Sequence, residues 1–107
     1  MLHDSRLFAA LADPVRLGLV ARLAEGPLTV GELAGPLAIS QPAVSRHLKV
    51  LEAAGLIETR VEGSRRPRRL RPERLAEARA WLARLEAEAE RQFARLDAVL
   101  DDMEDDG

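Results

Sequence analysis

The chain has 107 residues, a length that fits one domain, and it contains no cysteine, which excludes disulfides, thiolate metal sites and thiol catalysis. Hydrophobic residues make up 47% of the chain but aromatic residues only 3%, so leucine, alanine and valine must fill the core, as suits helices. The net charge of −2 conceals a basic middle and an acidic end. Residues 40–74 contain nine basic and four acidic side chains, whereas every charged side chain in residues 97–107 is acidic.

The chain carries no pattern of a membrane or secreted protein. No apolar run approaches the roughly 20 residues that a membrane-spanning helix needs. The first twelve residues mix charged and apolar side chains, unlike a secretory signal peptide. We therefore expect a cytoplasmic protein.

Residues 5–26 are predicted to form two helices. The first carries Leu7 and Phe8 on one apolar face. Asp13 is a suitable N-cap for the second, because its carboxylate can accept hydrogen bonds from the unpaired amides of the first turn. Pro14 suits the first helical position, where its missing N–H would have no partner. The second helix is expected to end before the next Gly-Pro pair.

Residues 29–55 are predicted to form a helix-turn-helix. Thr29 and Glu32 make a capping box, in which each side chain can accept a hydrogen bond from the other residue's backbone amide. The helix that they open is short because a Gly-Pro pair interrupts it. Ser40 caps the second helix and Gly55 ends it. The buried face of this second helix repeats at helical spacing: Val44, Leu48 and Leu51.

Residues 56–71 are predicted to form a two-stranded wing. Ile57, Thr59 and Val61 alternate, which places them on one side of a first strand. A Gly-Ser pair supplies the turn. Pro67 lacks the amide hydrogen that a strand ladder needs, so we expect an irregular second strand.

Residues 73–103 are predicted to form one long helix. Positions spaced alternately by three and four are apolar, with one exception, as in a coiled-coil seam. The seam consists of Leu75, Ala78, Leu82, Leu85, Ala89, Gln92, Leu96, Val99 and Met103. A single helix that projects from a small domain cannot bury this seam alone, so a second copy of the chain is the expected partner. The fold class is thus mainly α with a small β-hairpin wing (α+β), a winged helix-turn-helix of order α-α-α-α-β-β-α in one domain, residues 1–107.

The outward residues of the second helix of the helix-turn-helix have the chemistry of base readers. They gather mostly in its N-terminal half: Gln41, Ala43, Ser45, Arg46 and Lys49. Glutamine can bond adenine and arginine guanine, while serine serves a base or a phosphate. The helix N-terminus at Ser40 favours a phosphate oxygen because its unpaired amides point outward. Together with the basic hairpin, this pattern predicts contact with double-stranded DNA rather than a merely solvated helix face.

Two further sets of side chains each allow two interpretations. His47 either touches a phosphate or packs at the helix-turn-helix junction, which is the commoner role of a single histidine, and it stays among the DNA-binding candidates. Arg65, Arg66 and Arg68, with Arg69 beside them, either contact phosphates and a narrow minor groove or form a solvated hairpin. We expect DNA contact, because like charges at this density repel one another without a polyanion.

Two runs of the sequence resemble the ArsR/SmtB family of bacterial repressors: residues 40–57 (SQPAVSRHLKVLEAAGLI), preceded by Glu-Leu-Ala at 32–34, and residues 8–16 (FAALADPVR). The likeness extends from about residue 7 to residue 100. It implies a homodimer that binds an operator near a promoter and releases it when an effector arrives. It also implies an interface made by the first and last helices, for which the expected residues are Leu7, Phe8, Leu82, Leu85, Ala89, Leu96 and Val99.

The chain departs from the metal-sensing members of that family. Those members often carry cysteines in the third helix, where this chain has residues 29–33 (TVGEL), or histidines and carboxylates on the last helix, which has no histidine here. His3 and the neighbouring Asp4 could supply metal ligands, but the simpler interpretation is that they belong to a flexible chain terminus. The acids of residues 97–106 could attract a divalent ion, yet a solvated tail is the expected role. No metal ion and no cofactor are therefore expected.

The leading hypothesis is a sequence-specific DNA-binding repressor without a metal site of its own. Two alternatives stay open: a metal- or small-molecule-responsive repressor of the same fold, and a regulator that senses its signal through a partner protein docked on the long helix. An enzyme is not expected, because no Ser/His/Asp set, carboxylate pair or phosphate loop can be assembled from these residues.

Overall fold

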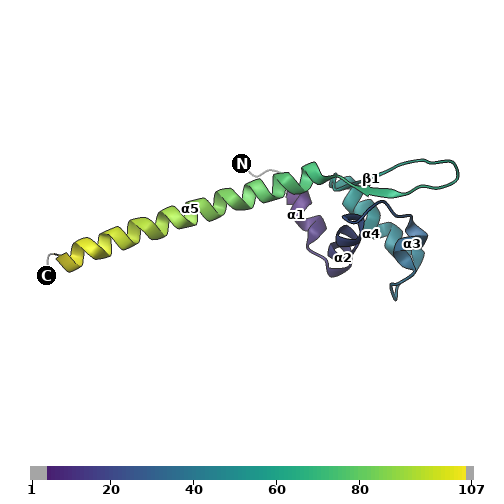
Figure 1. The fold of residues 1–107 in the computed structure, drawn as a ribbon. Helices are drawn as coiled ribbons and strands as arrows, with labels where there is room; N and C mark the ends of the chain where they lie inside the picture. The colour runs from purple at the N-terminus through teal and green to yellow at the C-terminus, as the bar shows by residue number, and fades with distance from the viewer. Residues whose placement is uncertain (1–4, 106–107) are drawn as a thin grey trace. The chain divides into compact units, whose positions relative to one another are not determined.

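The computed structural model describes residues 5–105, which form five helices and two strands (Figure 1). In chain order they are α1 (Ser5–Leu11), α2 (Pro14–Leu23), α3 (Val30–Ala34), α4 (Gln41–Ala53), β1 (Ile57–Thr59), β2 (Arg68–Leu70) and α5 (Pro72–Asp105). The chain divides into one compact unit that ends at Leu75 and a second that begins at Ala76. The order α-α-α-α-β-β-α confirms the predicted winged helix-turn-helix.

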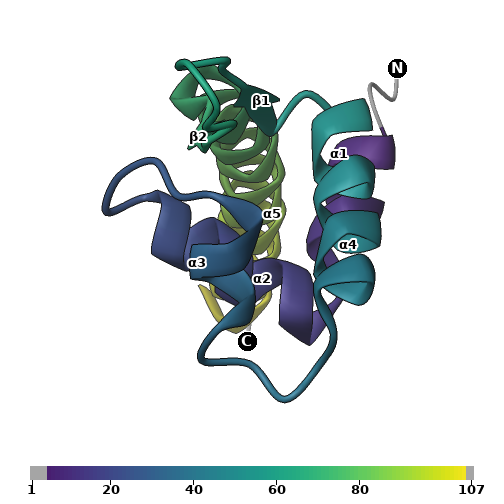
Figure 2. The same cartoon turned by 90° about the vertical axis from the view of Figure 1, so that its right-hand side faces the viewer.

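The core of the first unit is apolar and draws on every element from α1 to β1. Figure 2 shows the backbone of these elements. No charged or polar residue is buried among residues 5–105. The most deeply buried large side chains of this unit are Leu19, Leu33, Val44, Leu48, Leu51, Leu56 and Ile57, each less than 2% exposed. Three of them form the predicted buried face of α4, so the opposite face of this helix is left to solvent.

The predicted caps start the helices where the sequence indicates. Asp13 caps α2, since its Oδ1 accepts from the amides of Val15 at 2.9 Å and Arg16 at 3.1 Å. Ser40 caps α4 through a 3.3 Å hydrogen bond that the amide of Ala43 donates to Oγ. Gly55 follows α4 with a φ of +76°, a conformation that a side chain would strain. The helix-turn-helix therefore rests on local signals that the sequence shows directly.

The wing is an antiparallel pair in which Ile57 faces Leu70 and Thr59 faces Arg68. The first strand is shorter than the predicted alternation, which was wrong beyond Thr59: Ile57 is 1% exposed and Val61 is 65% exposed. Pro67 explains this limit, because its carbonyl accepts from the amide of residue 60 at 2.9 Å but it has no N–H to return. Beyond this point the hairpin has no regular strand (Figure 1), and Glu62 and Arg65 form an isolated antiparallel bridge next to its turn.

A third segment joins the base of the wing. Leu28, in the loop before α3, exchanges both backbone hydrogen bonds with Arg68: the Leu28 amide donates at 3.1 Å and the Arg68 amide at 2.7 Å. No feature of the sequence predicts this pairing. It fixes the base of the wing to the segment that leads into the helix-turn-helix.

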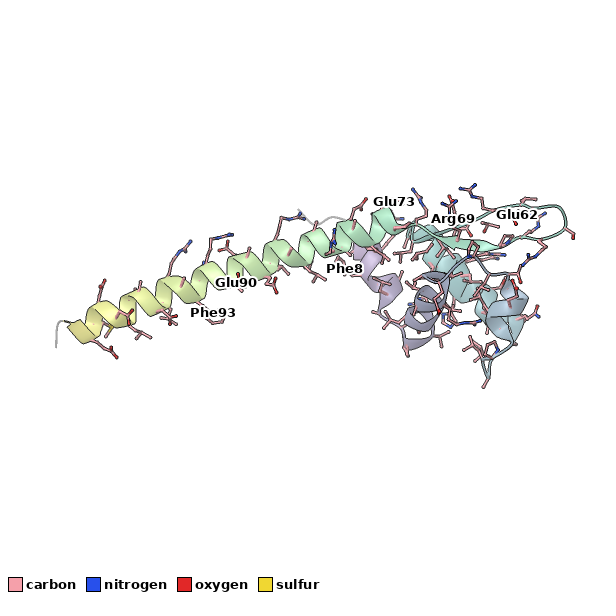
Figure 3. The ribbon with its side chains drawn as sticks, in the orientation of Figure 1. Phe8, Glu62, Arg69, Glu73, Glu90 and Phe93 are labelled. Atoms are coloured by element: carbon pink, nitrogen blue, oxygen red, sulfur yellow. The ribbon has the colours of Figure 1, made fainter. Side chains whose placement is uncertain are left out.

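The second unit is the continuous course of α5 from Ala76 onward. Side chains stand out from this helix along its length, with Glu90 and Phe93 among them (Figure 3). The predicted seam is exposed from Leu82 onward, at 53% for Leu82, 50% for Leu85 and 54% for Leu96, whereas Ala78 is buried at 7%. Among residues 5–105, no helix combines the length and the apolar character that crossing a membrane requires.

Candidate nucleic-acid interface

The outer face of α4 presents polar side chains with nothing bound to them. Gln41, Arg46 and Lys49 are exposed, and their side chains make no hydrogen bond or ion pair within residues 5–105. Ala43 and Ser45 lie half-buried between them. An amide, a guanidinium and an ammonium free of internal partners are donors available to a base edge or a phosphate.

His47 lies at the junction between α4 and α2, where its Nδ1 is 3.2 Å from the Nη1 of Arg16. The Arg16 guanidinium also donates from Nε to the carbonyl of Ala10 at 2.7 Å and from Nη2 to that of Ala9 at 3.3 Å. Because an arginine only donates, the His47 Nδ1 is the acceptor and Nε2 carries the proton of the neutral ring. Arg16 thus ties the end of α1 to the middle of α4.

Asp13, which caps α2, has a carboxyl pKa below its ordinary value of 3.8, chiefly because the backbone amide of Arg16 donates to it. Replacing Asp13 with alanine is expected to lower Tm by about 4–8 °C near neutral pH, because the α2 amides lose their acceptor. Because the Asp13 pKa is lower in the folded protein than in the unfolded one, the charged carboxylate stabilises the fold at any pH above the unfolded-state pKa. This stabilisation is lost as the pH falls through the folded-state pKa. The difference in Tm should therefore shrink below about pH 3.8.

Thermal unfolding followed by circular dichroism from about pH 7 to about pH 3 checks this result. Asp13→Asn is the matched control, since asparagine caps a helix without a charge and should keep most of the native Tm at neutral pH. A Tm difference for Asp13→Ala that stays constant across the range would contradict the assignment.

The wing arginines differ in what holds them. Arg65 donates from Nη2 to Oε1 of Glu32 in α3 at 2.9 Å. Arg68 turns back to the Arg66 carbonyl at 2.7 Å, and its Nε is buried with no hydrogen-bond partner in the described part of the chain. Arg66 is exposed and its side chain has no recorded partner within residues 5–105. The predicted basic wing is thus partly neutralised from within.

One oxygen of Glu32, Oε1, takes part both in the capping box of α3 and in the contact with the wing. This oxygen accepts from the Thr29 amide at 2.9 Å and the Thr29 Oγ1 at 3.0 Å. The hydrogen bond from the Thr29 backbone is the main cause that lowers the Glu32 pKa below 4.5, and Arg65 acts in the same direction. Glu32 therefore stays ionised at neutral pH.

Known proteins are similar to this chain both in sequence and in fold. A family model described as a helix-turn-helix domain matches residues 11–60. An ArsR-like transcriptional regulator from Rhodococcus sp. RHA1 superposes with a TM-score of 0.81 at 29% identity, over 89% of this chain and 90% of that one. The HTH-type transcriptional regulator Rv2034 of Mycobacterium tuberculosis is 50% identical over 91 residues, 85% of each protein.

The arsenical resistance operon repressor of Escherichia coli K12 is 42% identical over 85 residues, 78% of this chain and 69% of that protein. The chain belongs to the ArsR/SmtB family. It is a DNA-binding transcriptional regulator and not an enzyme. A further relative, the homodimeric winged helix-turn-helix DNA-binding domain of Mb0332 from Mycobacterium bovis, is 30% identical with a TM-score of 0.63, over 79% of each chain. ArsR/SmtB regulators bind operator DNA, typically as homodimers.

The residues that the ArsR/SmtB resemblance suggested for a dimer interface differ in exposure. Leu7 is buried at 3% exposure in the first unit, whereas Phe8 beside it is half-buried. On α5 the side chains of Leu82, Leu85, Leu96 and Val99 are about half exposed. Ala89 on the same seam is also exposed. Two large side chains outside the seam, Phe93 at 67% exposure and Leu100 at 49%, lie next to it and widen its apolar face.

No group of three or more histidine, cysteine or carboxylate side chains that could hold a metal ion occurs among residues 5–105. His3 and Asp4, the candidate ligands at the start of the chain, lie outside the described residues, as does Asp106. The acids of α5 beyond Leu96 are exposed wherever their side chains are described.

Proposed function

We propose that the protein is a cytoplasmic homodimeric repressor that reads its operator with α4 and the wing and holds no metal ion of its own. The observation that carries this proposal is the outer face of α4, where polar side chains are exposed without partners while the opposite face is buried. Residues 29–55 read the DNA, residues 56–71 flank it and residues 73–103 join the two copies.

Within this proposal the side chains of α4 divide by chemistry. Gln41 and Arg46 read base edges, because an amide matches adenine and a guanidinium matches guanine. Ser40 and Lys49 contact phosphates. Ala43 and Ser45 lie close to the bases, and His47 offers its Nε2–H to a phosphate because Arg16 occupies Nδ1.

The wing supplies the second contact with DNA. Arg66 is the cation offered most directly to a phosphate or to a narrow minor groove, because its side chain has no partner within the described residues. Arg65 and Arg68 contribute beside it, each held by a bond within the protein. DNA binding should therefore depend on salt through contacts from both α4 and the wing.

The second copy covers the seam of α5, and charge favours antiparallel helices. Residues 97–105 of α5 hold five acids and no base, whereas Arg79 and Arg84 lie near its start. Parallel helices would set the two acidic ends side by side, but antiparallel helices place each one level with the arginines of the other copy. A two-fold axis between Ala89 and Gln92 then sets Leu82 of one copy opposite Val99 of the other.

Titration of the protein against its own promoter DNA, with a panel of divalent metals and with a chelator, tests this function. We expect tight, salt-sensitive binding that no metal changes, and much weaker binding to unrelated DNA of equal length. Binding that appears or vanishes with one metal would overturn the proposal in favour of a metal-responsive repressor. Operator release caused only by a second protein would support a regulator that senses through a partner.

A further inference from the structure

The outer part of the wing is held to the helices by one side-chain ion pair in the described part of the chain. Its base is fixed by the backbone pairing of Leu28 with Arg68. Beyond Pro67 the backbone of the hairpin bonds only across itself, with Glu62 and Arg65 exchanging both backbone hydrogen bonds around the turn at 2.9 and 3.0 Å. The 2.9 Å contact from Arg65 to Glu32 is what connects this outer part to α3.

The negative charge of Glu32 is unfavourable on a surface that binds DNA. It lies in the first turn of α3, within the helix-turn-helix, and is exposed. A carboxylate near DNA repels phosphates, and here it also offsets the charge of a wing arginine. The capping box does not require the charge, because glutamine at the same position completes it equally. The ion pair with Arg65 therefore explains why this position is a charged glutamate.

Resting on the proposed DNA-binding function, we propose that Glu32 is a positioning residue for operator recognition. Through Arg65 it sets the place of the wing relative to the helix-turn-helix, so that Arg66 meets the groove in register with the bases that α4 reads. Glu32 does not touch DNA in this arrangement. Its carboxylate lowers affinity for any polyanion and raises the preference for the operator over other DNA.

Glu32→Gln separates these two effects, because it keeps the capping box and removes the charge. We expect operator affinity to fall about two- to fivefold, as for loss of one exposed ion pair. Affinity for unrelated DNA of the same length should stay equal or rise, since one repulsive charge is gone. The ratio of the two affinities, measured at several salt concentrations, is the readout.

Glu62→Gln is the matched control. It removes the same charge from the wing, but the Glu62 side chain has no recorded partner within residues 5–105. This variant should shift both affinities in the same direction and leave their ratio unchanged. An equal response of the two variants would overturn the proposal, because Glu32 would then act through charge alone.

Arg65→Gln, alone and combined with Glu32→Gln, completes a double-mutant cycle. We expect the two losses in the affinity ratio not to add, because either change frees the wing. Additive losses would overturn the proposal, as would an unchanged ratio in Glu32→Gln with Tm preserved. A native protein that shows no preference for its promoter would instead refute the proposed function itself, so the two failures are distinguishable.

Discussion

A protein with glutamate in place of Leu85 and Leu96 on α5 is expected to be monomeric and to bind its operator at least about a hundredfold more weakly. Each leucine side chain buried in an interface contributes on the order of 1.5–3 kcal/mol to the free energy of association. In a two-fold symmetric dimer each substitution removes two such side chains. Loss of the dimer also removes the gain from engaging two half-sites at once. Sedimentation equilibrium measures the first effect and operator titration the second.

Ala83→Glu combined with Ala94→Glu is the matched control, because both alanines are exposed on α5 and lie off the seam. This control should remain dimeric and keep its operator affinity. A monomer–dimer equilibrium that is the same for both double variants would remove the seam from the interface.

Introduced cysteines test the direction of the two helices on a background free of native cysteine. With antiparallel helices, Leu82→Cys mixed with Val99→Cys forms a disulfide-linked heterodimer, because these positions face each other across the axis. Val99→Cys alone should not cross-link. Efficient cross-linking of Val99→Cys to itself would instead establish parallel helices and refute the charge argument.

Loss of the Arg46 side chain is expected to weaken operator binding about ten- to a hundredfold and to relax the choice of base at one position. This is the range for a bidentate arginine contact with guanine, in which the guanidinium meets two acceptors that other bases do not offer together. Affinities of Arg46→Ala for operators substituted one base pair at a time measure both effects.

Lys49→Ala provides the comparison for Arg46→Ala on the same face of α4. As a phosphate contact it should weaken binding to every sequence alike and lower the slope of log affinity against log salt by about one. If Arg46→Ala also lost the same affinity on all operators, Arg46 would be a phosphate contact and base reading would fall to Gln41.

The helical part of the fold could be predicted because its signals are local. Asp13, Thr29 with Glu32, and Ser40 are caps whose partners lie two or three residues away, and the structure places each hydrogen bond where the sequence indicates. Gly55 likewise marks the end of α4 by a conformation that glycine favours. Helix boundaries and the outward face of α4 follow from such short-range chemistry.

The contacts that orient these elements could not be predicted, because each joins residues far apart in the chain. Nothing in the sequence indicates that Arg16 reaches His47, that Arg65 reaches Glu32, or that Leu28 pairs with Arg68. The sequence likewise shows that Leu7 belongs to an apolar face but not what covers it. The periodicity of apolar residues identifies the buried face of a helix. Which element packs against that face depends on the tertiary fold, which brings distant segments of the chain together.

The pairing of Leu28 with Arg68 divides the wing into a part that cannot change length and a part that can. Residues on the base side of Pro67 take part in a backbone ladder with a second segment of the chain, so an insertion there would shift that segment too. The turn at Gly63 is free of such neighbours, since a side chain at its Cβ position meets nothing within 4 Å. Under the proposed function, a change in the length of the tip would therefore alter how far along the DNA the wing extends without displacing α4.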